Sequence, residues 1–261
     1  METKNQPTAL VTGAAAGIGW ATASLFAARG YRVAIADLAG DKAAEQAAEL
    51  GASHRGFACN VTDEDAVQAT VGAVLKAFGR LDVVVNNAGI GDTSAPTLEQ
   101  TGDHFQRVLS VHLQGTFLMS RIAAQAMIDA GRPGAIVNIA PIAGFVGLPR
   151  RNAYGAAKAG IVAMTKSMGS EWGARSIRVN AVAPGYVQTA LVDKLIADGL
   201  LDGESITKRT PLGRFIQPRE IAEAVCFLAS PAASAITGTT LLVDAGWTAF
   251  GAAGDPSGAP T

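Results

Sequence analysis

The amino-acid sequence predicts an α/β fold, with a single doubly wound, seven-stranded parallel sheet and helices on both faces. Short apolar runs of strand length alternate along the chain with longer segments of helical period, as expected when parallel strands are buried on both faces. Right-handed crossovers between such strands place helices on either side of the sheet. The chain has 261 residues, 49% of them hydrophobic and 16% charged, which suits one well-filled domain and excludes a disordered chain.

Seven apolar runs are the candidate strands, and six segments of helical period are the candidate helices. We expect strands over residues 8–12, 31–37, 55–61, 82–86, 135–140, 177–183 and 240–244. We expect helices near residues 17–29, 41–50, 63–78, 99–130, 152–172 and 218–229. One domain should span residues 1–250, with a substrate lid, or alternatively an ordinary surface helix pair, near 186–217. Residues 251–261, rich in Gly, Ala, Pro and Ser, indicate a flexible tail.

Charge and composition exclude several classes of protein. The 21 Lys and Arg residues balance 22 Asp and Glu residues, and the net charge of −1 gives no basic field for nucleic acid or an acidic membrane. Cys59 and Cys226 form no disulfide framework, and three scattered histidines argue against a metal site. Residues 1–7 lack the apolar core of a signal peptide, and no run of ~18 apolar residues occurs. We therefore expect a soluble cytoplasmic protein, and the low charged fraction indicates an oligomer.

A glycine-rich turn follows the first expected strand. Gly13, Gly17 and Gly19 have the spacing GxxxGxG, which differs from the GxGxxG fingerprint. Glycines there permit close backbone approach and direct helix N–H groups at a pyrophosphate. Asp37 closes the second strand, where a carboxylate accepts hydrogen bonds from an adenosine ribose and repels a 2′-phosphate. This favours NAD over NADP, the alternative being that Asp37 only begins a turn near Gly40.

Two further strand ends carry amide side chains. Asn60 could meet an adenine edge, although turn initiation before Thr62 explains it almost as well. Asn87, Ala88 and Gly89 follow the fourth strand, where small residues suit backbone contact with a ligand in the crevice of the sheet.

Tyr154 and Lys158 stand at positions i and i+4 at the start of the expected helix 152–172, so their side chains share one face. A phenol with a pKa near ~10 is a poor base at neutral pH, but an adjacent ammonium favours the phenolate and lowers that pKa. Tyr154 could then exchange a proton with an alcohol or a ketone. Without other motifs the pair would be an ordinary solvated helix face.

The glycine turn, Asn86-Asn87-Ala88-Gly89, Tyr154 with Lys158, and Pro184-Gly185 occur in this order. From about Thr8 to Trp247 the chain thereby resembles the short-chain dehydrogenase/reductase family. The resemblance implies a Rossmann-type fold, a tetramer, and hydride transfer between a nicotinamide and a carbonyl or alcohol carbon. It implies that Tyr154 is the catalytic acid/base and that Lys158 lowers its pKa and holds the nicotinamide ribose.

The resemblance also implies a set of cofactor-binding residues. They are Gly13, Ile18 and Gly19 at the pyrophosphate and neighbouring ribose, Asp37 at the adenosine ribose, Asn60 and Val61 at the adenine, Asn87 at the cofactor ribose region, and Pro184, Val187 and Thr189 at the nicotinamide, with Gly17, Ala88 and Gly89 in the same binding turns.

Two active-site positions depart from the family pattern. Pro141 stands where the family has a serine whose hydroxyl binds the substrate oxygen, and proline offers neither a hydroxyl nor a backbone N–H. Asn138, Asn152 or a water could supply the missing donor. His112 stands where the family has an asparagine of a proton relay. A histidine there could keep the relay running by titrating near neutrality, or it could be purely structural.

The leading hypothesis is an NAD-dependent oxidoreductase that acts on a secondary alcohol or ketone of largely apolar character. Arg150 and Arg151 leave room for an anionic group on the substrate, unless they are simply solvated. One alternative is an NAD-binding protein whose redox chemistry is lost, as the changes at Pro141 and His112 suggest. Another is an enzyme that uses Tyr154 and Lys158 for elimination or isomerisation.

Overall fold

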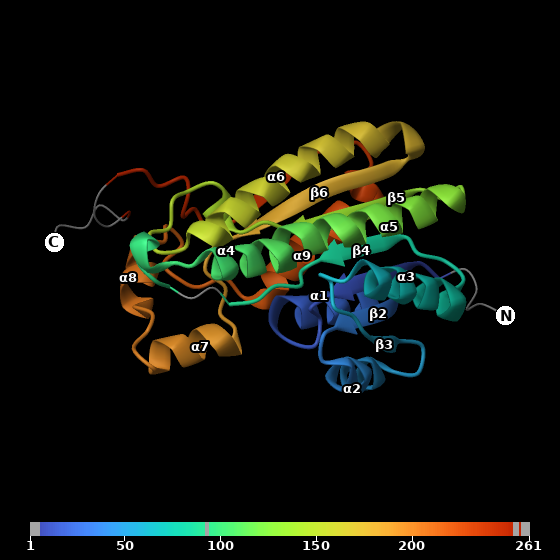
Figure 1. Ribbon diagram of the computed structural model, residues 1–261, viewed down its shortest axis with the longest axis horizontal. Coiled ribbons are helices and arrows are strands. Elements are labelled where there is room, and N and C mark those ends of the chain that lie inside the picture. Colours follow the sequence, from blue (N-terminus) through green and yellow to red (C-terminus); the bar gives the residue numbers. More distant parts are fainter. Residues whose placement is uncertain (1–5, 92–93, 253–255, 257–261) are drawn as a thin grey trace.

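Seven parallel strands form one sheet in the order β3-β2-β1-β4-β5-β6-β7 in the computed structural model (Figure 1). The structure describes residues 6–91, 94–252 and 256. The predicted fold class is confirmed. The strands are β1 (Thr8–Thr12), β2 (Arg32–Asp37), β3 (Arg55–Ala58), β4 (Val83–Asn86), β5 (Gly134–Ile139), β6 (Ile177–Pro184) and β7 (Thr240–Val243).

Nine α-helices and several short helical turns connect these strands within the described residues. The helices are α1 (Gly17–Ala28), α2 (Gly40–Leu50), α3 (Glu64–Phe78), α4 (Gly102–Leu109), α5 (Gly115–Asp129), α6 (Asn152–Trp172), α7 (Ala190–Ala197), α8 (Gly203–Arg209) and α9 (Pro218–Ala229). The turns are η2 (Thr97–Glu99), η3 (Ser110–Gln114), η4 (Ile142–Gly144), η5 (Gly173–Arg175) and η6 (Pro231–Ala233).

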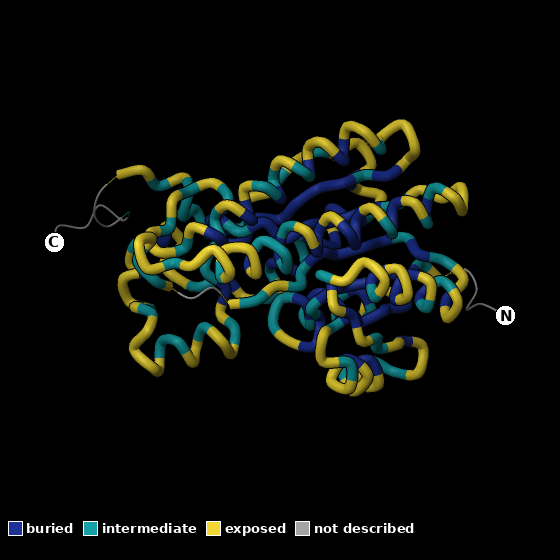
Figure 2. Tube along the Cα trace, viewed as in Figure 1, coloured by how far each residue is buried: buried dark blue, intermediate teal, exposed yellow. Residues whose placement is uncertain are grey.

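The two faces of the sheet bury separate apolar cores, because successive side chains of a strand point to opposite faces. Ala9 and Val11 pack with residues of α1, α2 and α9 on one face. Leu10 packs with residues of α3, α5 and α6 on the other face. Figure 2 shows the strands as the buried centre of the molecule, with exposed helix surfaces around them. This two-sided burial explains why the strands are nearly uninterrupted apolar runs.

The strand order reverses at β1, which pairs with β2 on one side and with β4 on the other. Helices that leave neighbouring strands at such a point turn to opposite faces of the sheet, so a crevice opens at the carboxyl ends of the strands. Thr12, Asp37 and Asn86 end β1, β2 and β4 at this edge. The fold therefore brings the predicted cofactor residues to one edge.

The expected helix 99–130 is divided in the structure. α4 begins at Gly102, since the Thr101 side chain caps it by accepting the His104 N–H. A π-helical turn, η3, then joins α4 to α5 and contains His112. A π turn within a helix frequently marks a functional site, and apolar periodicity alone does not reveal it.

The segment between β6 and α9 contains α7 and α8, which lie at the end of the molecule away from α2 and α3 (Figure 1). Its ends are joined by an isolated bridge between Val187 and Ile216. The expected tail lies mostly outside the described residues, as do residues 1–5.

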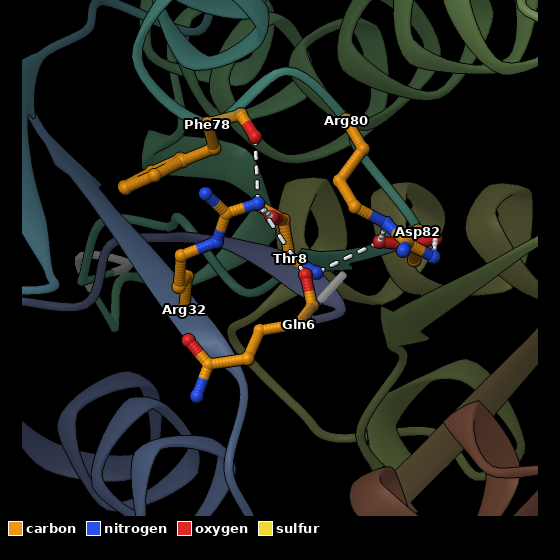
Figure 3. A network of polar contacts seen from close by, with 6 residues as sticks. All are labelled: Gln6, Thr8, Arg32, Phe78, Arg80 and Asp82. Atoms are coloured by element: carbon orange, nitrogen blue, oxygen red, sulfur yellow. Dashed lines mark hydrogen bonds and ion pairs between the residues drawn. The ribbon is translucent and has the colours of Figure 1, made fainter. Parts of the chain in front are cut away.

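A polar cluster closes the opposite, amino-terminal edge of the sheet (Figure 3). The Arg32 guanidinium donates to the Phe78 carbonyl oxygen over 2.6 Å and lies over the Phe78 ring. Asp82 accepts the Thr8 N–H over 2.8 Å and forms an ion pair with Arg80. These contacts join the starts of β1, β2 and β4 to the end of α3, so this edge has a structural role.

Candidate active site

A cleft of about 980 Å³ runs along the carboxyl edge of the sheet. It brings together every predicted catalytic and cofactor-binding residue except Gly17 and Gly19, which shape the turn but do not line the cleft. The residues of the prediction that line it are Gly13, Ile18, Asp37, Asn60, Val61, Asn87, Ala88, Gly89, His112, Pro141, Tyr154, Lys158, Pro184, Val187 and Thr189.

The glycine turn leaves the start of α1 open toward the cleft. Gly13 and Gly17 have positive φ angles of 61° and 57°, a conformation that glycine adopts without strain. A Cβ at Gly19 would lie 2.3 Å from the Gly13 carbonyl oxygen. The α1 N-cap has no side-chain hydrogen bond, and the first turn has no acidic residue. The uncapped N–H groups and the helix dipole fit a pyrophosphate.

Asp37 and Asn60, predicted to contact the adenosine half of a dinucleotide, both line the cleft. The Asp37 carboxylate accepts the Ala15 N–H and the Ala39 N–H, each over 3.1 Å, so it both lines the cleft and braces a turn. The Asn60 side-chain oxygen accepts from the backbone and hydroxyl of Thr62, which is the turn role considered above. Lys42, in the first turn of α2, also lines the cleft. This cation was not predicted from the sequence, because only the residues beside Asp37 and in the glycine turn were considered as partners for a phosphate.

Asn87 ties the ends of β1 and β4 together. Its side-chain nitrogen donates to the carbonyl oxygens of Thr12 and Gly13 over 3.0 and 2.9 Å. The Thr12 hydroxyl oxygen accepts the N–H groups of Asn87 and Ala88. The side chain of Asn87 therefore positions the glycine turn, while its neighbours leave backbone exposed to the cleft.

Tyr154 and Lys158 lie in the first two turns of α6, as predicted, and both line the cleft. The Lys158 Nζ lies 5.4 Å from the centre of the Tyr154 ring and donates to the carbonyl oxygen of Ile139 over 3.1 Å. Lys158 is buried, and burial lowers its pKa to about 7. Its ammonium form thus depends on acceptors supplied by the cleft or its ligand.

Pro141 directly precedes the turn η4 and lines the same cleft as Tyr154 and Lys158. Neither predicted substitute for the missing hydroxyl, Asn138 or Asn152, lines it. Asn138 is buried, accepting from Asn86 and donating to Thr165. Asn152 donates to the Thr97 hydroxyl on the exposed side of α6. The expectation that either amide replaces the serine is therefore wrong, because each is already hydrogen-bonded elsewhere.

His112 packs against Tyr154 from η3. Its ring lies edge-to-face with Tyr154, with centres 5.2 Å apart, and its Nε2 is 3.0 Å from the Ile90 carbonyl oxygen. The ring also occupies the space beside Gly89, where a Cβ would lie 2.5 Å from its Cε1. Burial, together with the charge of Lys158, lowers the pKa of His112 to about 3. The ring is neutral at neutral pH, so a relay that depends on its titration near pH 7 does not fit this geometry.

This buried histidine should make the protein less stable in acid. The folded-state pKa of about 3 lies below the usual 6.5, so the unfolded chain binds a proton first as the pH falls. His112 therefore does not lower the free energy of unfolding above about pH 6.5. Below that pH, the free energy of unfolding should decrease by about 1.4 kcal/mol per pH unit. The His112→Asn variant should lose this slope in urea denaturation between about pH 7 and about pH 4.5.

The comparison between variants isolates His112, because the other buried histidine, His54, is present in both. A His104→Asn variant is the control, since that side chain is only partly buried. Identical pH slopes for the wild type and His112→Asn would contradict the assignment.

The residues predicted to contact a nicotinamide lie at the end of β6 or just after it and line the cleft. Val187 forms the bridge to Ile216, and Thr189 caps α7 by accepting the Val192 N–H. The cleft is also lined by Arg151, one of the two arginines that the sequence offered as a contact for an anionic group. Residues of the expected lid line it too, although none of them had an individual role in the prediction: Tyr186, Leu191, Val192, Leu195 and Leu201. The amphipathic spacing of residues 191–201 indicated an apolar helix face there, but it does not tell which face meets the cleft.

The described residues contain neither a metal-ligand cluster nor a helix that could cross a membrane. No group of three or more His, Cys, Asp and Glu side chains in residues 6–91, 94–252 and 256 is placed to hold a metal ion. No helix in the same residues is long and apolar enough to span a membrane.

A doubly wound parallel sheet with a cleft at the carboxyl ends of its strands is the architecture of proteins that bind nucleotides and dinucleotides. A family model described as Enoyl-(Acyl carrier protein) reductase matches residues 13–248. The chain is 46% identical to a D-threitol dehydrogenase from Mycolicibacterium smegmatis, over 92% of each protein. It is 45% identical to a cis-4-hydroxycyclohexanecarboxylate dehydrogenase from Sinomonas cyclohexanicum, over 92% of this chain and 96% of that one.

The chain belongs to the short-chain dehydrogenase/reductase family. It is an oxidoreductase of the alcohol and ketone type with a nicotinamide cofactor, NAD or NADP. It also spans 43% of the length of an uncharacterized short-chain type dehydrogenase/reductase from Sinorhizobium fredii, to which it is 47% identical over 91% of this chain. An actinorhodin polyketide ketoreductase solved with NADPH has the same fold, with a TM-score of 0.89 and 34% identity over 96% of this chain and all of that one.

Proposed function

We propose that this protein is an NAD-dependent dehydrogenase or reductase that interconverts a secondary alcohol and a ketone. The observation that carries the proposal is that Asp37, the open start of α1, and the Tyr154–Lys158 pair line one continuous cleft. An acid/base group alone, or a dinucleotide-sized channel alone, would fit many kinds of protein. Their presence in one cleft supports hydride transfer between a bound dinucleotide and a substrate.

Each residue of the pair has a distinct task in this proposal. The nicotinamide, when bound, supplies or accepts the hydride. Tyr154 holds the substrate oxygen and gives or takes its proton. Lys158 lies behind the phenol, where its ammonium form stabilises negative charge on the oxygen and can hold the nicotinamide ribose. The carbonyl of Ile139 orients the Lys158 Nζ.

The test is to supply NAD with a panel of aliphatic, cyclic and aromatic secondary alcohols and to follow NADH by its near-ultraviolet absorbance. We expect turnover of at least one member that stops when the cofactor is omitted. NAD binding without turnover of any alcohol, or of the matching ketones with NADH, would contradict the proposal.

For the cofactor, we expect the Asp37→Ala variant to lose most of its discrimination against NADP. A carboxylate beside the adenosine ribose accepts hydrogen bonds from a diol and repels a phosphate, so its removal weakens NAD binding by about 1–3 kcal/mol. Lys42 in the same region can then accept the phosphate charge. The measurement is kcat/KM for both cofactors, with Asp41→Ala, an exposed neighbour outside the cleft, as the control. An unchanged ratio would refute the role of Asp37.

The substrate body should be largely apolar. Leu191, Leu195 and Leu201 project from the α7 region into the cleft, and Leu148 lines it from the loop before α6. Leu191 is 60% exposed, which suits a side chain that becomes buried when a substrate is covered. We assign residues 186–217 as the substrate lid on this ground.

We also propose a cytoplasmic homotetramer. Two separate surfaces expose large apolar side chains, Phe117 on α5 near Trp172 on α6, and Leu241 and Leu242 on the edge strand β7. Two such faces on one chain are what a tetramer with perpendicular two-fold axes requires. An unpaired apolar edge strand is otherwise prone to aggregation. Light scattering of the purified protein measures its mass, and a monomer would contradict this assignment.

Pro141 favours a second candidate function, a nicotinamide-binding protein whose redox chemistry is lost. Among the described residues, no Ser, Asn or Gln side chain beside Tyr154 takes the place of the missing hydroxyl in the cleft lining. The complete dinucleotide channel is common to both candidates, so only the alcohol and ketone panel separates them.

A further inference from the structure

The two arginines before α6 occupy different environments. Arg150 is exposed, and its guanidinium donates to the Ser94 carbonyl oxygen over 3.4 Å. Arg151 is half-buried and lines the cleft, three residues before Tyr154. The pair thus contains one residue that faces the active site and one that does not.

The charge of Arg151 is uncompensated within the part of the chain that the structure describes. Its guanidinium makes no hydrogen bond or ion pair there, and the only carboxylate among the cleft-lining residues is Asp37. Asp37 is at the other end of the cleft, accepting two backbone N–H groups. The substrate end therefore carries positive charge from Arg151 and Lys158 with no acidic side chain to balance it. A half-buried, unpaired arginine in a cleft is a recognition element for an anion.

Tyr186 provides a second donor in the same region. It follows β6, lines the cleft, and has its ring held against Trp247 with centres 4.8 Å apart. Burial raises the pKa of Tyr186, whereas the nearby charges of Arg151 and Arg209 lower it. Its hydroxyl has no hydrogen-bond partner among the described residues. Arg209 is committed elsewhere, because it stacks on Trp247 and donates to that residue's carbonyl oxygen.

We propose that Arg151 and Tyr186 bind a carboxylate of the substrate, so that the substrates are hydroxy acids or the matching oxo acids. One planar guanidinium and one hydroxyl match a single negative charge, whereas a phosphate dianion would call for more cations. The leucines that line the same cleft, Leu148, Leu191, Leu195 and Leu201, would contact an apolar body that joins the alcohol carbon to the carboxylate. Two-point attachment also compensates for Pro141, since Arg151 positions the substrate that the missing hydroxyl does not hold. The substrate assignment rests on the proposed function, whereas the carboxylate subsite does not.

The test measures binding rather than turnover. Isothermal titration of the wild type with cyclohexanecarboxylate and with cyclohexanecarboxamide, both with saturating NADH and without it, should show a preference for the acid of about tenfold or more. The Arg151→Gln variant should lose that preference. Arg150→Gln, the matched control, should keep it, and Arg151→Lys should retain part of it, because a lysine keeps the charge without the planar fork.

The outcomes separate this inference from the redox proposal. Equal binding of acid and amide by the wild type, or an undiminished preference in Arg151→Gln, would overturn the subsite. A preference lost only in the Arg151 variants supports it, even if no alcohol is oxidised. If turnover occurs, Arg151→Gln should raise KM for 4-hydroxypentanoate about tenfold or more, and by a much larger factor than KM for 2-pentanol. An equal rise for both would again contradict it.

Discussion

Replacing Tyr154 with phenylalanine is expected to reduce kcat by about 10²–10⁴-fold, the contribution of a positioned general acid/base. The aromatic ring remains, so its edge-to-face contact with His112 and its place beside the Lys158 ammonium are retained. Only the hydroxyl that meets the substrate oxygen is lost. The variant should therefore bind NAD as the wild type does while its turnover on the best alcohol of the panel falls.

Tyr31→Phe is the matched control, because this partly buried tyrosine packs on Phe26, remote from the cleft. Its turnover should equal that of the wild type. Should Tyr154→Phe retain wild-type kcat with unchanged thermal stability, the phenol would have no part in proton transfer, and the assigned mechanism would fail.

The Pro141→Ser variant is expected to gain turnover. Serine restores a hydroxyl and a backbone N–H at the position directly before η4, in the lining of the cleft. One such donor is worth about 10²–10³-fold in rate where it is dominant, and this is the upper limit of the gain, since the Tyr154 hydroxyl is proposed to hold the same substrate oxygen. The measurement is kcat and kcat/KM on the same alcohol.

Pro149→Ser supplies the control, because Pro149 is exposed and does not line the cleft. It should leave kcat unchanged. A large loss in Pro141→Ser, with stability preserved, would mean that the proline shapes a specialised pocket rather than leaving one incomplete.

The strands were the most predictable part of the fold. Residues 8–12 form β1 as expected, and β6 begins at Ile177 as expected but continues through Pro184. A parallel strand buried on both faces is apolar at most positions, and this preference is visible in the residues themselves. The expected strand 55–61 was too long, since β3 ends at Ala58 and pairs only with β2. An edge strand has less pairing to extend it.

The candidate site was predicted where side-chain chemistry and chain position coincide. Asp37, Tyr154 and Lys158 stand at strand ends or on a helix face that the sequence pattern locates, and the cleft contains all three. Asn138 was considered as a substitute for the missing serine hydroxyl, but an amide side chain can form hydrogen bonds with a ligand or with its neighbours in the core. Asn86 and Thr165 satisfy it in the core, and no spacing rule reveals those partners.

The sequence by itself determined the parallel sheet, the glycine turn, and the tyrosine–lysine pair, because each depends on local periodicity or on residues a few positions apart. Only the tertiary structure decided that His112 is buried against Tyr154 with its pKa lowered to about 3. It also decided that Arg151 rather than Arg150 lines the cleft. The burial of a side chain and its contacts depend on which distant segments of the chain pack against it. That packing is set only when the whole sheet and its helices have come together.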